Sequence, residues 1–432
     1  MLRFARILTI LRPFTRKGWG HWLRFLLLLA AASWLGHLLS SANWLTPLRY
    51  NLYHRQLLMR DRSQIHPTRT ALVLLSDEDY WGDGFAARTP LKRDVLAGLV
   101  DRLNAVGANT VALDVDLRSP RPHDPGFEYA DYKAEDEKLL AAIGRMCAAG
   151  RHVVLASSVR FGDDGYEETP SIYTSRLKQK ELGCVTTGYI QLPFDMRRMP
   201  GPLELANGDK LDSLSLAVTK IAAPDAYAVA TDHPEHGFRF SEYLSQEDFF
   251  RPLNGRRFVF SLQQLTTTPD WALRDQLDGK LVFVGANWHT YAYETGPLAD
   301  SHNSPGGTEP GVMLHANFVE AMLNQTGTFT PISDSTAEML EIALALVLAA
   351  IGALEIHSAW KWAALATSIV LSILFTYTLL QNLGLFLDFL VPLLMILLHS
   401  LGDEAIEIWH EFREMKRNEA NTVRIETAEG EE

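Results

Sequence analysis

The chain has 432 residues, of which 47% are hydrophobic, and a formal net charge of −12 at pH 7. Such an acidic chain lacks the general basic surface that binds nucleic acid, so we expect no nucleic-acid partner. It contains two cysteines, Cys147 and Cys184. They are too few for a chain of this size to depend on a disulfide framework, and a single disulfide or two free buried thiols are both compatible with the sequence.

Four apolar segments set the predicted topology. A bilayer core of about 30 Å needs about 20 mostly apolar residues in a helix. Runs of this kind cover residues 23–41, 336–356, 360–380 and 383–402. The first run is longer than the apolar part of a typical secretory signal peptide and lacks a convincing small-x-small cleavage site, so we interpret it as an uncleaved transmembrane helix.

Basic residues near the ends of these helices indicate their orientation. Residues 1–22 form a basic N-terminus, which predicts that this end lies in the cytoplasm. Residues 42–335 then form an extracytoplasmic domain, and residues 403–432 form a cytoplasmic tail helix. We therefore expect a multi-pass protein of a bacterial cytoplasmic (inner) membrane, with a periplasmic domain, both termini in the cytoplasm and the lipid bilayer as a partner.

The extracytoplasmic domain alternates strands with helices. Residues 70–76 are a continuous apolar run typical of a buried strand, and 90–106 are an amphipathic helix with Pro90 at its first turn and Gly107 as its stop. Residues 110–115 then predict a second strand, parallel to the first and paired with it. Further strands are predicted at 153–157, 186–192, 257–261 and 281–285, and helices at 135–149, 212–223 and 311–323, whereas 224–247 and 287–309 are expected to be an insertion and a loop. This order predicts an α/β layered domain with a largely parallel sheet, followed and preceded by transmembrane helices.

The order of these pieces resembles a known family. The segments are VLLSDEDYWG, RDVLAGLVDRLNAVGANTVALDV, DEKLLAAI, VVLAS, GYIQLPFDMRRMP, LDSLSLAV, RPLNGRRFVFS, DGKLVFVGA and PGVMLHANFVEAML. Together they resemble the second type of CHASE domain, the extracytoplasmic sensory module named for its association with cyclases and histidine kinases. The likeness covers residues 50–324, and three transmembrane helices after the domain are also usual in that family.

The resemblance implies a sensor architecture but no particular ligand. Family members commonly continue into a kinase, a cyclase or another effector, whereas here only residues 403–432 follow the last predicted transmembrane helix. We therefore expect a receptor-like protein that signals to a separate partner and acts as a homo-oligomer or within a membrane-protein complex. An apolar stripe on the tail helix, formed by Ile406, Trp409, Phe412 and Met415, fits a partner-contact helix or a membrane-surface helix.

Charged residues at predicted strand ends form the candidate ligand site. Asp77 and Asp79 follow the first strand, and Asp114 and Asp116 end the second. Ligands of open α/β sheets bind outside the carboxyl ends of strands, so these carboxylates are predicted to meet there with Arg88. Such a cluster would suit a divalent cation such as Ca²⁺ or Mg²⁺. Alternatively, the aspartates cap helices and pair with arginines.

Evidence for catalysis is weak. The segment around Asp114 and Asp116 resembles the nucleophile motif of haloacid-dehalogenase-type phosphatases, but the other motifs of those enzymes do not follow, and no nucleophile elbow, zinc-protease motif or P-loop is present. His315 lies in an apolar helix and is expected to be a core histidine rather than a metal ligand. We therefore expect no enzyme, no catalytic residue, no cofactor and no established metal site. The alternatives are a structural subunit of a cell-envelope complex and, third, a periplasmic metal-dependent hydrolase.

Overall fold

The computed structural model describes one domain in most detail. The described residues are 66–121, 131–162, 165–169, 171–178, 183–192, 200–232, 244–292, 295–304 and 307–324, with isolated positions at 34, 330–331, 336, 339 and between 363 and 416. This domain lies within a compact unit, Tyr50–Pro331. None of the helices within the described residues is long and apolar enough to cross a membrane, and the predicted transmembrane helices lie almost wholly outside those residues.

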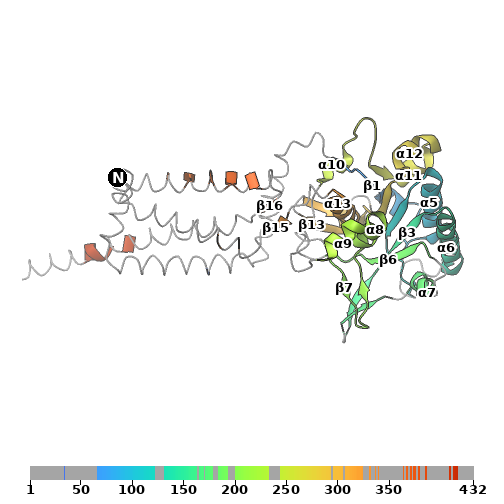
Figure 1. Cartoon of the computed structure of the whole chain (residues 1–432), viewed down its shortest axis with the longest axis horizontal. Helices are drawn as coiled ribbons and strands as arrows, with labels where there is room; N and C mark the ends of the chain where they lie inside the picture. Colours follow the sequence, from blue (N-terminus) through green and yellow to red (C-terminus); the bar gives the residue numbers. More distant parts are fainter. Residues whose placement is uncertain are drawn as a thin grey trace, which may run out of the picture. The chain divides into compact units, whose positions relative to one another are not determined.

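A six-stranded parallel sheet forms the centre of the domain, in the order β6-β3-β2-β10-β1-β9 (Figure 1). Its strands are β1 (Thr70–Leu75), β2 (Thr110–Asp114), β3 (His152–Ser157), β6 (Val185–Tyr189), β9 (Val259–Ser261) and β10 (Leu281–Ala286). These strands confirm the predicted α/β class and lie within three residues of the predicted bounds. The continuous apolar runs of β1 and β10 are explained by burial on both faces.

The pairing of the first two strands differs from the prediction. β1 and β2 are parallel but do not touch, because the last strand, β10, lies between them and pairs with both. A right-handed crossover specifies the direction of two strands without requiring them to be neighbours. Every residue of β10 is buried, as expected for a strand at the centre of the sheet.

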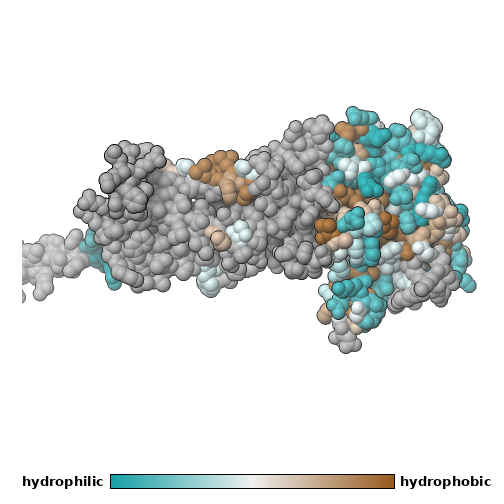
Figure 2. Space-filling model, viewed as in Figure 1, coloured by the Kyte–Doolittle hydropathy of each residue, from teal (hydrophilic) through white to brown (hydrophobic). Residues whose placement is uncertain are grey.

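Helices cover both faces of the sheet (Figure 1). One face packs on α5 (Arg93–Val106), α6 (Tyr132–Ala148), α11 (Leu262–Thr267) and α12 (Asp270–Leu277). The other packs on α8 (Leu214–Ala222), α9 (Pro224–Asp232), α10 (Gln246–Phe250) and α13 (Gly311–Leu323). Two separate apolar cores therefore sandwich the sheet. Figure 2 shows hydrophilic and hydrophobic residues interspersed on the domain surface, with hydrophilic residues gathered over α11 and α12.

The helix boundaries follow local chemistry. α5 begins at Arg93 rather than at Pro90, which lies in the preceding loop after a cis peptide bond. α5 ends at Gly107 as predicted, with φ of 99°, a left-handed conformation that glycine adopts readily. The close approach of β10 to α13 requires another glycine: a Cβ on Gly285 would lie 2.5 Å from the Cβ of Val312.

Shorter elements extend from the sheet ends. The predicted loop 287–309 contains two hairpins, β11 (His289–Tyr291) with β12 (Thr295–Leu298), and β13 (Ser301–Ser304) with β14 (Gly307–Pro310). The remaining elements are α4 (Asp77–Trp81), α7 (Ile172–Lys178), β4 (Val159–Gly162), β5 (Gly165–Glu168), β7 (Leu203–Glu204), β8 (Lys210–Leu211), β15 (Thr330–Pro331) and β16 (Leu385–Phe386). The predicted insertion begins with α9, and its residues 233–243 lie outside the described residues.

A disulfide joins the two cysteines, which resolves the alternatives left open by the sequence. Cys147 lies in the last turn of α6 and Cys184 lies directly before the edge strand β6, with their Cα atoms 5.4 Å apart. Both cysteines also pack against the first core. The bond holds an edge strand, which has a strand neighbour on one side only, to a helix of the core. Such bonds persist in oxidising compartments outside the cytoplasm.

We expect the double substitution Cys147→Ser/Cys184→Ser to lower the free energy of unfolding. The bond closes a loop with a sequence separation of 37 residues. A loop of that length corresponds to about 4 kcal/mol in the chain-entropy model. Chemical denaturation of the full chain in detergent measures the loss, and wild-type protein treated with reductant should show a similar loss. A reductant that leaves wild-type stability unchanged would contradict the assignment.

Candidate functional site

The connections around β10 create a switch point at the carboxyl end of the sheet. From β1 the chain continues into α4 and then α5 on the first face, whereas from β10 it continues through the hairpins into α13 on the second face. Neighbouring strands whose connections leave toward opposite faces open a crevice beyond their carboxyl ends. The junction of β1 and β10 is therefore the place where this fold positions a ligand site.

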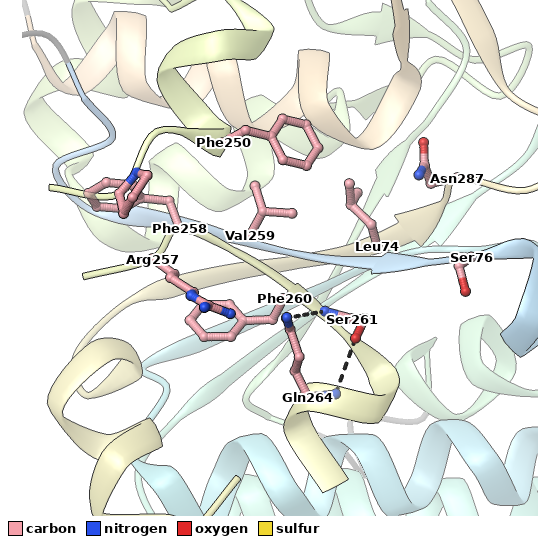
Figure 3. Close-up of a pocket in the computed structure, with 11 residues that line it drawn as sticks. Leu74, Ser76, Phe250, Arg257, Phe258, Val259, Phe260, Ser261, Gln264 and Asn287 are labelled. Carbon is pink, nitrogen blue, oxygen red and sulfur yellow. Dashed lines mark hydrogen bonds between the residues drawn. The ribbon is translucent and has the colours of Figure 1, made fainter. Parts of the chain in front are cut away.

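A cavity of about 450 Å³ extends from this junction, where Ser76 and Asn287 line it, along β1 and the edge strand β9 (Figure 3). This volume is within the range of small-molecule sites. Its apolar lining consists of Leu74, Phe250, Pro252, Phe258, Val259 and Phe260. Its polar lining consists of Ser76, Arg257, Ser261, Gln264 and Asn287. Figure 3 shows Arg257 and Phe258 toward one end and Asn287 and Ser76 toward the other, so the two ends of the cavity differ in chemistry.

Two of the polar groups are held by helix caps. Ser76 begins α4, where its hydroxyl donates to Asp79 Oδ2 at 2.9 Å and the same carboxylate accepts the Ser76 N–H at 2.8 Å. Ser261 begins α11 in the same way, with its N–H donating to Gln264 Oε1 at 3.0 Å. These reciprocal bonds fix both side chains. The Ser76 hydroxyl both donates and accepts in its cap, and the Ser261 hydroxyl accepts the Gln264 N–H at 3.1 Å.

Asn287 is a polar lining group that takes no part in these caps. It follows β10 directly, and its backbone N–H donates to the Leu75 carbonyl at 2.9 Å, which fixes the backbone across the junction. Its half-buried side-chain amide makes no hydrogen bond with any of the described residues. An amide carries two donors and one acceptor, so Asn287 can recognise a polar ligand group.

The predicted acidic residues of the first strand have partners inside the protein. Asp77 accepts the His289 N–H at 2.8 Å and lies 2.7 Å from His289 Nδ1. Burial alone would raise the pKa of Asp77, but these hydrogen bonds from His289 lower it. Asp79 forms the cap with Ser76 described above. Both carboxylates therefore hold α4 and the β10 end in place.

Arg88 also lies apart from the cavity. Its guanidinium forms a bidentate ion pair with Glu135 at 2.7 and 3.0 Å and lies 4.7 Å from the centre of the Tyr132 ring. Glu135 additionally accepts the Arg93 N–H at 2.9 Å at the start of α5. This buried ion pair connects α6 with the loop before α5, which is a structural role.

The two aspartates predicted at the end of β2 differ from each other: Asp114 ends the strand, and Asp116 follows it. Asp116 is paired with Arg118, through the backbone N–H at 3.0 Å and Nε at 2.9 Å. Asp114 is buried, and its Oδ2 has no hydrogen-bond partner within the described residues. Burial, together with the negative charge of Asp300, raises the pKa of Asp114 well above its usual range. Asp114 is therefore set up to be neutral rather than to attract a cation.

The five predicted site residues thus do not converge on one centre, and none of them lines the cavity. Among the described residues, no three His, Cys, Asp or Glu side chains could hold a metal ion together, so the divalent cation considered for the acidic cluster finds no support there. His315 is a buried core histidine as predicted, 2.8 Å from the Ser215 hydroxyl. Burial lowers the pKa of His315 to about 4.

The substitution Asp114→Asn should change how stability depends on pH. Folding raises the pKa of this carboxyl group, so the folded state is more stable when the group is protonated. The free energy of unfolding of the wild type therefore falls as the pH rises above about 4, the ordinary pKa of aspartate. The asparagine variant lacks this loss, and its stability relative to wild type should increase with pH. Thermal unfolding between acid and neutral pH measures it, with the exposed Asp275→Asn variant as control. Equal pH profiles for the Asp114→Asn variant and wild type would contradict the neutral state.

Comparison with known proteins identifies the domain. The chain matches the family model described as CHASE2 domain over residues 25–351. No curated protein and no solved structure matches the chain significantly. Because the matched region covers well over half of the sequence, the chain belongs to the CHASE2 domain family.

Proposed function

We propose that this protein is a membrane-anchored sensor that binds a ligand in its extracytoplasmic domain and signals to a separate cytoplasmic or membrane partner. CHASE2 is an extracytoplasmic sensory domain, which fits a sensor role and implies a membrane-associated protein. The observation that supports ligand binding best is the cavity of about 450 Å³ at the switch point, with Asn287 unused at one end.

A buried carboxylate supplies a route from the domain to the neighbouring segments of the chain. Glu320 on α13 is fully buried, and its Oε1 accepts the N–H groups of Arg69 and Thr70 at 2.8 and 2.6 Å. Its Oε2 accepts the Thr68 hydroxyl and the Asn324 amide, both at 2.8 Å. Residues 68–70 lead into β1, and Asn324 follows α13. One carboxylate therefore joins the segment that enters the domain to the segment that leaves it.

α13 links this carboxylate to the ligand end of the sheet. The helix begins after the β13–β14 hairpin that follows β10, and Gly311 at its start donates its N–H to the Asp300 carbonyl at 3.0 Å. A ligand that displaces the end of β10 would move α13, and through Glu320 it would move residues 68–70. Such a displacement requires two states of the domain. A ligand shifts the equilibrium between them only if it binds one state more tightly than the other.

Exposed apolar side chains support the membrane and partner parts of the proposal. Helical positions within the predicted transmembrane residues 360–380 expose Val370, Leu371 and Leu374. The tail exposes Ile408, Trp409, Phe412 and Met415. Large apolar patches on a surface mark contacts with a membrane or another protein. The first group suits lipid, and the second suits a separate signalling partner or another copy of the chain.

Glu320→Gln tests the link between the two segments. Glutamine keeps the shape of the side chain but replaces one accepting oxygen with an NH₂ group. The Thr68 hydroxyl then loses its acceptor, and the Asn324 amide loses one of its three. We expect a loss of about 1–3 kcal/mol in the free energy of unfolding. Denaturation of the full chain in detergent measures it. The exposed Glu204→Gln variant is the control and should change stability by less than about 0.5 kcal/mol. A Glu320→Gln variant as stable as the control would remove this link.

Deleting residues 403–432 tests the sensor itself. The truncated chain should insert into the membrane and fold outside as before, because the tail is not part of the domain. It should lose both its co-purifying partner and the downstream response in cells. An unchanged response would contradict the proposal. A partner retained at fixed stoichiometry by the extracytoplasmic domain alone would favour the structural subunit instead.

A further inference from the structure

We propose that the cavity beside β9 binds a small organic carboxylate with a flat apolar body, the carboxylate at Arg257 and a hydrogen-bonding group at Asn287. The assignment names the ligand class of the sensor proposed above and rests on that function for its biological consequence. Three features of the cavity support it: a cation that pairs with no described residue, an exposed apolar wall, and an amide at the opposite end that bonds no described residue.

The cation is Arg257. Its side chain is exposed and forms no hydrogen bond or ion pair with any of the described residues, although its backbone N–H donates to Gln276 Oε1 at 3.2 Å. Other arginines of the domain, such as Arg88 and Arg145, are held in bidentate pairs with carboxylates. A guanidinium left free at the mouth of a cavity offers a planar pair of donors that matches a carboxylate.

The surroundings of Arg257 add positive charge. Arg256 is adjacent, and Lys280 lies 6.0 Å from the centre of the Phe258 ring that lines the cavity. Burial is the main cause of the lowered pKa of Lys280. The charges of Arg256 and Arg69 lower this pKa further, whereas the charge of Glu320 raises it. Arg251 nearby is paired with Asp248. This local excess of positive charge, in a chain of net charge −12, favours an anion over a cation.

The apolar wall defines the body of the ligand. Phe250 at the end of α10 lines the cavity and is 50% exposed, which is unusual for a phenylalanine next to a packed core. Leu74 and Val259 lie beside it in Figure 3 and form the floor. Aromatic rings bury large areas and stack well on other flat groups. A flat apolar ligand would therefore cover the exposed part of Phe250.

The size of the cavity and its opposite end complete the description. A volume of about 450 Å³ suits a small molecule rather than a protein segment. At the end away from Arg257, the hydroxyls of Ser76 and Ser261 are used in caps, and the Asn287 amide is free to bond the ligand. A hydroxyl or carbonyl on the far side of the ligand would satisfy it.

The test uses 6-hydroxy-2-naphthoate with two analogues in which the carboxylate is replaced by a neutral hydroxymethyl or a cationic aminomethyl group. Each probe is titrated by calorimetry into the full chain in nanodiscs of zwitterionic lipid, with empty nanodiscs as blanks. We expect the carboxylate to bind at least about tenfold more tightly than the neutral analogue, the effect of one charge-assisted pair. The cationic analogue should bind more weakly still.

Substitutions locate the binding. Arg257→Gln should weaken the carboxylate by about tenfold and leave the neutral analogue unchanged, because it removes only the charged pair. The adjacent exposed Arg256→Gln is the matched control, expected to change affinity by less than about threefold, since exposed charges are screened. Asn287→Ala and Phe250→Ala should weaken all three probes. Arg257, Arg256 and Phe250 are exposed, so these variants should fold, and thermal unfolding checks it.

The outcomes separate this assignment from the sensor proposal. No binding, equal binding of the three probes, or carboxylate binding unaffected by Arg257→Gln and Phe250→Ala would overturn the ligand class. The sensor could then still respond to another ligand. Binding at the cavity that leaves hydrogen exchange at residues 68–70 and 320–324 unchanged would support the ligand class and contradict signalling through Glu320.

Discussion

The insertion of β10 between β1 and β2 is the constraint on which the rest of this domain depends. Its residues are buried on both faces, so burial of apolar area favours a central place. The position needs one close contact with α13, which Gly285 permits. Once β10 is central, its connection to α13 on the second face and the connection of β1 to α5 on the first face open the crevice between them.

The two cores that result are joined by polar contacts at both ends of the sheet. At the carboxyl end, the Asp77–His289 pair holds the start of α4 against the chain that leaves β10. At the amino end, Glu320 holds residues 68–70 against α13. When a buried carboxylate with several hydrogen-bond donors loses one of them, the folded state is strongly destabilised. Glu320 therefore specifies one arrangement of the segments that it joins. The same property suits a link that must transmit displacement without loosening.

Much of the fold could be predicted from the sequence because the strands and helices have strong local signals. The sequence predicted the apolar runs of β1 and β10, the helix stop at Gly107 and the core histidine His315. The place of β10 was not, because pairing order depends on contacts between segments far apart in the chain. The hairpins after residue 287 were also missed, since their strands are short and polar and pack at the sheet end.

The residues predicted as a ligand site make structural contacts within the protein, and their charge explains why they stood out in the sequence. Carboxylates at strand ends draw attention in a sequence, yet a carboxylate is also the side chain that best caps a helix or pairs with arginine. Asp79, Asp116 and Arg88 were all satisfied in this way. The sequence held a weaker signal for the cavity: Asn287 directly follows a buried strand, and Ser76 directly precedes a helix. Arg257 and Asn287 line the cavity, and their side chains bond no other residue that the structure describes. They are therefore better indicators of a ligand than the carboxylates that look most reactive in the sequence.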